Sequence, residues 1–168
     1  MSLLSVKGWL SEAERYALVE WAAQADNQFR APRFVNIGVE YGASLHCLRA
    51  ASHAAQLYGI DLDNTKLEGD PRAELITGDS GSLAVVSQVA PPVHLLLIDG
   101  GHDLQTVQQD IALWVPKVVR EGLILFHDYS TWELHLEVKQ AVDEWAKGTP
   151  WACHVAQVDT LRVYRWMR

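Results

Sequence analysis

Polar side chains that can do chemistry follow the apolar runs of this sequence. Five short apolar runs each end at a glycine, a carboxylate or an imidazole, in the order Gly38, Asp61, Asp79 with Ser80, Asp99, and His127 with Asp128. Carboxylates and imidazoles are groups that hold hydroxyls, metal ions and mobile protons. Their regular placement after apolar runs favours a functional edge at which they converge.

Buried strands that alternate with amphipathic helices are needed to bring these groups together. Helical spacing covers 44–53 and extends from Leu104 to Val118 and from Leu134 to Trp145. This alternation predicts a parallel sheet with right-handed crossovers, whose ligand-binding edge is the carboxyl end of its strands. Near-continuous apolar runs are typical of strands that are buried on both faces. The expected parallel strands are 34–37, 57–60, 73–76, 94–98 and 123–126.

Both ends of the sequence add further elements. Ser11 and Glu14 have the spacing of a capping box, which predicts that a helix begins there, and Pro32 stops any continuing helix. The last two apolar runs, 153–158 and 161–166, are separated by only two residues. So short a link permits only antiparallel neighbours, so we expect a C-terminal hairpin.

Composition indicates one globular domain. The sequence has 168 residues, of which 49% are hydrophobic and 21% charged. We expect a single domain over 1–168, with an N-terminal helical segment over 1–33 and a sheet core over 34–168. Cys47 and Cys153 lie in apolar surroundings and are expected to be small core residues.

The overall charge and the hydropathy exclude some partners. The formal net charge of −7 disfavours duplex nucleic acids and anionic membranes. No apolar run reaches the roughly 18 to 20 residues that a membrane span needs, and the N-terminus lacks the apolar core of a signal peptide. We therefore expect a cytoplasmic protein.

A glycine loop opens after the first expected strand. Residues 38–44 read GVEYGAS, in which the glycines permit a sharp turn and close approach to a ligand, although an ordinary strand-to-helix turn would look the same. Asp61, 19 residues after the second glycine, is placed to accept both hydroxyls of a ribose, with Asp63 as the alternative. The third glycine of a dinucleotide loop is missing, which favours a nucleoside without phosphates. Asp79 and Ser80 would then meet an adenine edge.

Taken together, these residues resemble class I S-adenosylmethionine-dependent methyltransferases. Residues 34–44, 97–102 and 122–129 read FVNIGVEYGAS, LIDGGH and GLILFHDY. They are similar to the first, fourth-strand and fifth-strand motifs of the small methyltransferase group that includes macrolide-sugar O-methyltransferases. The resemblance covers about 34–145. It implies a three-layer Rossmann-like α/β fold with a mostly parallel seven-stranded sheet and an antiparallel C-terminal hairpin.

The same resemblance implies S-adenosylmethionine as the cofactor. Asn36 departs from the family pattern, which usually carries Glu or Asp at this position. The implied cofactor-binding residues are Gly38, Gly42 and Ser44 around the methionine part, Asp61 at the ribose, Asp79 and Ser80 at the adenine, and Asp99 at the border of the site.

The expected active site lies at the ends of the fourth and fifth strands. Asp99 and Asp128 can share a Mg²⁺ ion, as in metal-dependent catechol-type relatives; alternatively, Asp99 borders the cofactor and Asp128 caps the next helix. His102 resembles the catalytic base of those relatives, with a helix cap as the other interpretation. His127 is open as a second base, a metal ligand or a structural group. The remaining histidines, His135 among them, show no ligand spacing and are expected to be surface or core residues.

These expectations combine into one predicted function and two alternatives. The prediction is methyl transfer from S-adenosylmethionine to an oxygen of a small-molecule acceptor, with His102 as general base and Asp99, His127 and Asp128 beside it. The alternatives are a metal-dependent hydrolase that uses the same His and Asp residues, and a non-catalytic nucleoside-binding protein of the same fold. A tryptophan-rich surface on a small domain leaves a homodimer open, in which a partner subunit adds substrate contacts.

Overall fold

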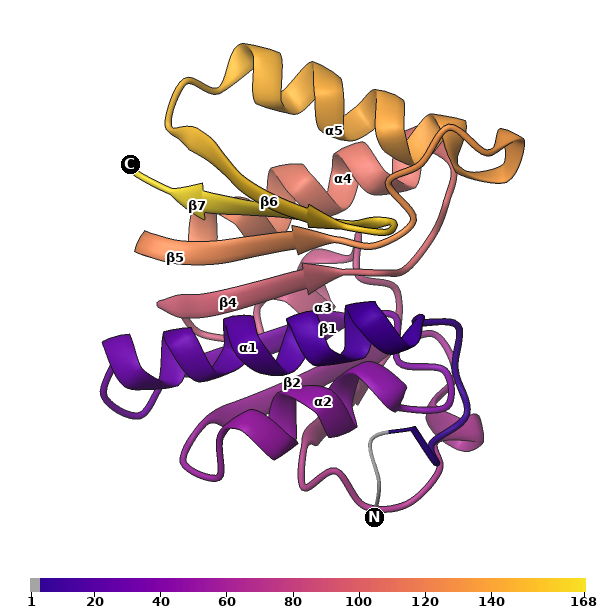
Figure 1. The fold of residues 1–168 in the computed structure, drawn as a ribbon, viewed down its shortest axis with the longest axis vertical. Helices are drawn as coiled ribbons and strands as arrows, with labels where there is room; N and C mark the ends of the chain where they lie inside the picture. Colours follow the sequence, from indigo (N-terminus) through magenta and orange to yellow (C-terminus); the bar gives the residue numbers. More distant parts are fainter. Residues whose placement is uncertain (1–3) are drawn as a thin grey trace.

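A mixed β-sheet runs through the centre of the protein (Figure 1). The structure is a computed structural model that describes residues 4–168. Within these residues the sheet has seven strands in the order β3-β2-β1-β4-β5-β7-β6. The strands are β1 Arg33–Ile37, β2 Gln56–Asp61, β3 Glu74–Thr77, β4 Val93–Ile98, β5 Val118–Phe126, β6 Ala152–Val158 and β7 Leu161–Trp166.

Strand directions confirm the predicted topology. The first five strands pair in parallel, whereas β7 pairs antiparallel with both β5 and β6. The order in which strands are added to the sheet changes direction between β1 and β4. The loops that follow β1 and β4 therefore leave the sheet on opposite sides of a crevice. The described residues therefore form the predicted Rossmann-like sheet, which is mostly parallel and ends in an antiparallel C-terminal hairpin.

Helices cover both faces of the sheet (Figure 1). None of the helices described is long and apolar enough to cross a membrane. One face packs against α1 Glu12–Gln28 and α2 Ala43–Ala51, and the other against α3 Leu83–Val86, α4 Leu104–Trp114 and α5 Leu136–Gly148. Three short 3₁₀ segments among the described residues complete the elements: η1 Asn64–Lys66, η2 Val115–Lys117 and η3 Glu133–His135.

Strand β4 shows how one apolar run supplies two cores. Leu95 and Leu97 pack with α1 and α2, while Leu96 and Ile98 pack with the helices on the other face. All four side chains are buried. Because successive side chains of a strand point to opposite faces, a strand covered on both sides has no polar face. The continuous apolar run therefore places Asp99 at the end of a central, rigid strand.

Several details differ from the sequence prediction. Val118 was expected on a helix, but α4 ends at Trp114, the 3₁₀ segment around Pro116 follows, and Val118 starts β5. Leu134, expected on a buried helix face, lies in η3 and is 82% exposed. Cys153, expected in the core, is exposed because β6 is an edge strand. The short helix α3 was not predicted.

Gly38 permits the closest backbone approach between the β1 and β4 ends. Its φ of +84° lies in the left-handed region, and an added Cβ would lie 1.9 Å from the carbonyl oxygen of Asp99. Asp99 directly follows β4 and its backbone N–H donates to the Ile37 carbonyl at 2.9 Å, so its own carbonyl cannot move away without disturbing the end of the sheet. The glycine is therefore required by the fold itself, apart from any ligand.

Replacing this glycine tests the backbone constraint. We expect Gly38→Ala to lower the free energy of unfolding by more than about 2 kcal/mol, because it adds both strain and a clash. Gly148→Ala is the matched control, since nothing lies within 4 Å of its added Cβ at the end of α5. The control should change stability by about 1 kcal/mol or less, in the stabilising direction. Equal stability of the two variants in urea unfolding would contradict this account.

Candidate functional site

A cavity of about 1370 Å³ opens at the carboxyl ends of the parallel strands. It is larger than the roughly 300–1,000 Å³ of common small-molecule sites, so it has room for two ligands. Of the residues that the sequence predicts for the site, Gly42 and the alternative ribose-binding residue Asp63 do not line it. The predicted residues that do are Gly38, Ser44, Asp61, Asp79, Ser80, Asp99, His102, His127 and Asp128.

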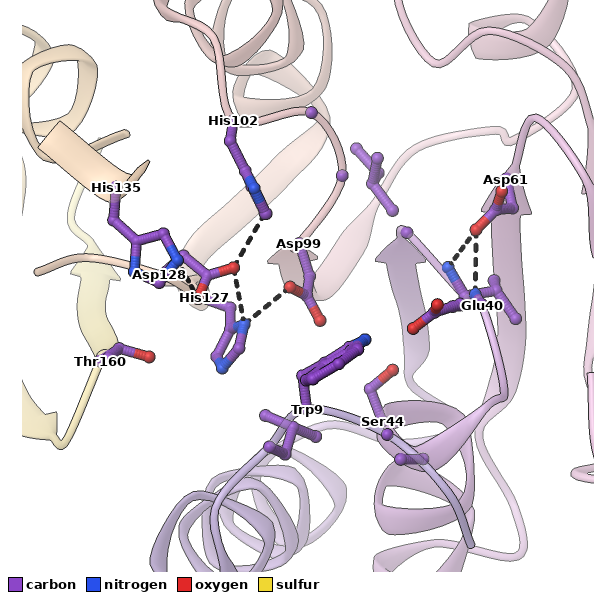
Figure 2. Close-up of a pocket in the computed structure, with 18 of the residues that line it drawn as sticks. Trp9, Glu40, Ser44, Asp61, Asp99, His102, His127, Asp128, His135 and Thr160 are labelled. Atoms are coloured by element: carbon purple, nitrogen blue, oxygen red, sulfur yellow. Dashed lines mark hydrogen bonds and ion pairs between the residues drawn. The ribbon is translucent and has the colours of Figure 1, made fainter. Parts of the chain in front are cut away.

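Two groups of polar side chains face each other across this cavity (Figure 2). Asp61 lies on one side with the glycine loop, and a chain of His102, Asp128, His127 and Asp99 lies on the other. Trp9 lies between them, at the rim, and its side chain is 81% exposed. The convergence that the strand ends predicted is therefore present in the structure.

Asp61 holds the glycine loop in shape. Its Oδ2 accepts hydrogen bonds from the backbone N–H groups of Val39 at 2.7 Å and Glu40 at 3.0 Å, and its Oδ1 accepts one from Asp63. The Asp63 carboxylate instead accepts a hydrogen bond from the backbone N–H of Thr65, and Asp63 is the N-cap of η1. Only Asp61 of these two carboxylates lines the cavity, so the geometry favours it as the hydroxyl-binding residue.

The rest of the loop is positioned by backbone geometry. Gly42 has a φ of +88°, forms the N-cap of α2, and would meet the Leu67 side chain if it carried a Cβ. Buried Asn36 donates from Nδ2 to the Gly38 carbonyl at 2.6 Å. Its Oδ1 has no hydrogen-bond partner among residues 4–168, which leaves a buried acceptor beside the loop.

Asp79 and Ser80 lie along the cavity beyond β3. The Asp79 carboxylate accepts from the Gly81 backbone at 2.8 Å, and the Ser80 carbonyl accepts from Trp114 Nε1 at 3.0 Å. Trp114 is fully buried, so this bond anchors the β3 loop to the core under α4. Two hydrogen bonds therefore hold the loop where the sequence predicts an adenine edge.

A buried histidine is surrounded by three carboxylates on the opposite side. His127 Nδ1 lies 2.8 Å from Asp99 Oδ1 and 3.2 Å from Asp128 Oδ2, and its Nε2 lies 3.3 Å from Glu14 Oε2. Glu14 also accepts from the Thr160 backbone and hydroxyl at 2.8 and 2.7 Å. With both ring nitrogens facing carboxylates, His127 has none free for a substrate proton, so the geometry favours the structural one of its three predicted roles.

The charges in this group follow from its geometry. Burial alone would lower the pKa of His127, but the charge of Asp99 and hydrogen bonds to Asp128, Asp99 and Glu14 raise it to about 12. Burial alone would raise the pKa of Glu14, but hydrogen bonds from His127 and Thr160 lower it to about 2. His127 is therefore an imidazolium and Glu14 a carboxylate at neutral pH.

His102 is the imidazole that remains accessible. Its side chain is 48% exposed, lines the cavity, and places Nε2 2.9 Å from Asp128 Oδ2. The hydrogen bond to Asp128 raises the pKa of His102, partly opposed by burial. A half-exposed imidazole beside a carboxylate is equipped to take up a proton from a molecule in the cavity.

Sequence reasoning missed two residues of this site. Glu14 was assigned only to the capping box, which the structure confirms, and its contact with His127 spans 113 residues of sequence. His135, expected to be a surface or core residue, lies with Nε2 3.3 Å from Asp128 Oδ1. No local spacing links either residue to the site, because their contacts arise only when the chain folds.

The sequence of the sheet core matches a known family model. Residues 35–129 match the model described as "Methyltransferase domain". The chain belongs to this methyltransferase domain family. A search of curated protein sequences gives no match.

Solved structures share the fold of this methyltransferase domain. MycE from the mycinamycin biosynthetic pathway, in complex with Mg and SAH, is 19% identical with a TM-score of 0.69, over 96% of this chain and 51% of that chain. A putative caffeoyl-CoA O-methyltransferase from Staphylococcus aureus is 13% identical (TM-score 0.71), over 99% and 88%. Cofactor-bound Rv0187 from MTB is 16% identical (TM-score 0.75), over 98% and 84%. The chain thus spans about half the length of MycE. At identities of 13–19%, the similarity to these structures shows a shared fold alone.

The charge on Glu14 predicts how stability depends on pH. Its folded pKa of about 2 lies below the ordinary value of 4.5, so its contribution is complete above pH 4.5 and is lost as pH falls toward 2. We expect Glu14→Gln to lower the free energy of unfolding at pH 7 by about 1–3 kcal/mol. The variant should also lose less stability than the wild type between pH 5 and pH 2.

Urea unfolding over that pH range measures both effects. Glu12→Gln is the matched control, because Glu12 is exposed in the same first turn of α1. It should change stability by about 0.5 kcal/mol or less. If Glu14→Gln and Glu12→Gln unfolded alike at all pH values, the buried pair would not stabilise the fold.

Proposed function

We propose that this chain transfers a methyl group from S-adenosylmethionine to an oxygen atom of a small molecule. One observation carries the proposal: a single cavity joins the Asp61 side, which suits a nucleoside, to the His102 side, which suits proton removal. The family match supports methyl transfer, and O-methyltransferases among the similar structures support an oxygen acceptor.

The residues on the Asp61 side fit the cofactor. The two carboxylate oxygens have about four acceptor positions, of which backbone N–H groups use three, so Asp61 can hold the glycine loop and still accept a ribose hydroxyl. Buried Asn36 supports the loop from behind by donating to the Gly38 carbonyl. Gly38, Gly42 and Ser44 would frame the methionine part. When bound, the cofactor supplies an electrophilic methyl group on a cationic sulfonium.

The opposite wall suits that positive charge and the departing proton. The carboxylates of Glu14 and Asp128 outnumber the one imidazolium of His127, while burial raises the pKa of Asp99, so the cluster attracts cations. His102 would accept the proton of the acceptor hydroxyl at its Nδ1, because its Nε2–H donates to Asp128, which orients the ring. Asp99 and His127 would then position Asp128 and the cavity wall.

The same donors do not favour magnesium shared by Asp99 and Asp128. His127 Nδ1 lies within 2.8 Å of one carboxylate and 3.2 Å of the other, so its proton fills the gap between them. Magnesium also prefers an octahedron of oxygen ligands, whereas imidazole nitrogens surround Asp128. The predicted Mg²⁺ site therefore has no part in the proposed mechanism.

Apolar side chains at the rim indicate an acceptor with an apolar body. Trp9, Leu62, Trp132 and Leu134 are strongly exposed and all line the cavity. Exposed large side chains around a pocket are typical of ligand-binding surfaces, and a second copy of the chain could cover them in the homodimer that the sequence left open. We propose a small hydroxylated molecule, one end of which packs on this rim.

Cofactor binding separates the proposal from the hydrolase alternative. We expect isothermal titration to show binding of S-adenosylhomocysteine, weakened about tenfold or more by Asp61→Asn because a charged ribose acceptor is lost. Asp63→Asn is the control and should bind like the wild type. No binding to the wild type at millimolar ligand would end the proposal.

Turnover separates it from a non-catalytic nucleoside-binding protein. His102→Ala should keep S-adenosylhomocysteine binding but lose about 10²- to 10⁴-fold in methyl transfer to a panel of hydroxylated acceptors. Because Asp128 raises the pKa of His102, the wild-type rate should rise with pH through a midpoint above 6.5, and Asp128→Asn should lower that midpoint. Wild-type turnover by His102→Ala would exclude the base role.

A further inference from the structure

A second cluster of ligand-type side chains lies on the outer side of Asp128. His102 comes from the loop after β4, Asp128 from the end of β5, and His135 from η3. One ligand atom of each lies within 4.8 Å of the other two. Figure 2 shows the two imidazoles on either side of the Asp128 carboxylate, at the cavity wall.

The distances are close to those of a metal centre. Asp128 Oδ2 lies 2.9 Å from His102 Nε2, and Asp128 Oδ1 lies 3.3 Å from His135 Nε2. Ligands about 2.0 Å from a tetrahedral zinc ion lie about 3.3 Å from one another. Small side-chain rotations would therefore bring the three groups around one ion.

The ring of His135 is oriented from behind. Its Nδ1 lies 3.0 Å from Ser130 Oγ, and the Trp132 ring stacks on it at a centroid distance of 5.9 Å. Histidine ligands characteristically bond through the second ring nitrogen, which sets the tautomer and aims the other nitrogen at the metal. With an ion bound, Nδ1 would donate to Ser130 Oγ and the Nε2 lone pair would bind the ion beside Asp128.

The donor types select the class of metal. Two imidazole nitrogens and one carboxylate suit zinc, cobalt, nickel or ferrous ions, whereas magnesium and calcium prefer oxygen. Buried His127 already contacts Asp128, so the cation would lie on the side of Asp128 that faces the cavity-lining imidazoles of His102 and His135. Three protein ligands leave further positions open to the cavity.

We propose that His102, Asp128 and His135 form a binding site for a divalent transition-metal ion of the zinc class. The site goes beyond the proposed methyl transfer and does not depend on it. An ion bound to His102 Nε2 leaves the ring proton on Nδ1, which is the nitrogen that the proposed mechanism uses as the base. Metal binding and the base role of His102 therefore exclude each other.

Calorimetric titration of the full, tag-free chain with Zn²⁺ tests the site. The Cys153→Ser background removes the exposed thiol, which could bind zinc by itself. We expect one zinc ion per chain, bound at least about 100-fold more tightly than Mg²⁺. His135→Gln should weaken zinc binding at least about tenfold, while His53→Gln, at an exposed histidine outside the site, should not.

The variant Ser130→Ala and the ligand S-adenosylhomocysteine provide independent tests of the metal site. Ser130→Ala should weaken zinc binding about tenfold by freeing the His135 ring, even if His135→Gln fails to fold. The site is refuted if zinc binds no more tightly than magnesium, or if His135→Gln and Ser130→Ala both bind zinc like His53→Gln. Titration of the same samples with S-adenosylhomocysteine separates the two proposals, because cofactor binding without zinc binding overturns only the metal site.

Discussion

The buried imidazolium of His127 is the constraint on which the arrangement of this site depends. A charge removed from water is costly unless it is paired and hydrogen-bonded, and here Glu14, Asp99 and Asp128 compensate it. The Glu14 carboxylate also accepts hydrogen bonds from Ser11 and Thr160. One small network thereby ties the start of α1 to the ends of β4 and β5 and to the C-terminal hairpin.

This network also divides the work among three histidines. His127 is enclosed and is committed to the carboxylates, whereas His102 is half-exposed and faces the cavity. His135 meets the same carboxylate, Asp128, from the outer side. Asp128 therefore connects a structural charge, a proposed base and a proposed metal ligand. Its backbone φ of +58° is uncommon outside glycine, and such strain often occurs at functional sites.

The two sides of the cavity depend on different physical features. On the nucleoside side, backbone geometry dominates, because Gly38 must approach the Asp99 carbonyl and Asp61 must bind the loop amides. On the opposite side, electrostatics dominates, because three carboxylates surround one imidazolium. A ligand that carries both hydroxyls and a positive charge matches the two sides together. That match is the physical reason for proposing a sulfonium nucleoside as the cofactor.

The sequence by itself determined a mostly parallel sheet with an antiparallel C-terminal hairpin, and the convergence of Asp61, Asp99 and Asp128 on one edge. These follow from local patterns, because apolar runs define buried strands and parallel strands share a carboxyl edge. Predictions from local patterns were wrong where tertiary packing decided the secondary structure or the burial of a residue, as at Val118, Leu134 and Cys153.

Only the tertiary structure showed that Glu14 pairs with His127 and that His135 meets Asp128. The first contact joins residues 113 positions apart, and the second depends on the path of the loop after β5. Sequence spacing reports neighbours along one helix or strand, whereas the partners of a buried charge are chosen by the packing of several elements.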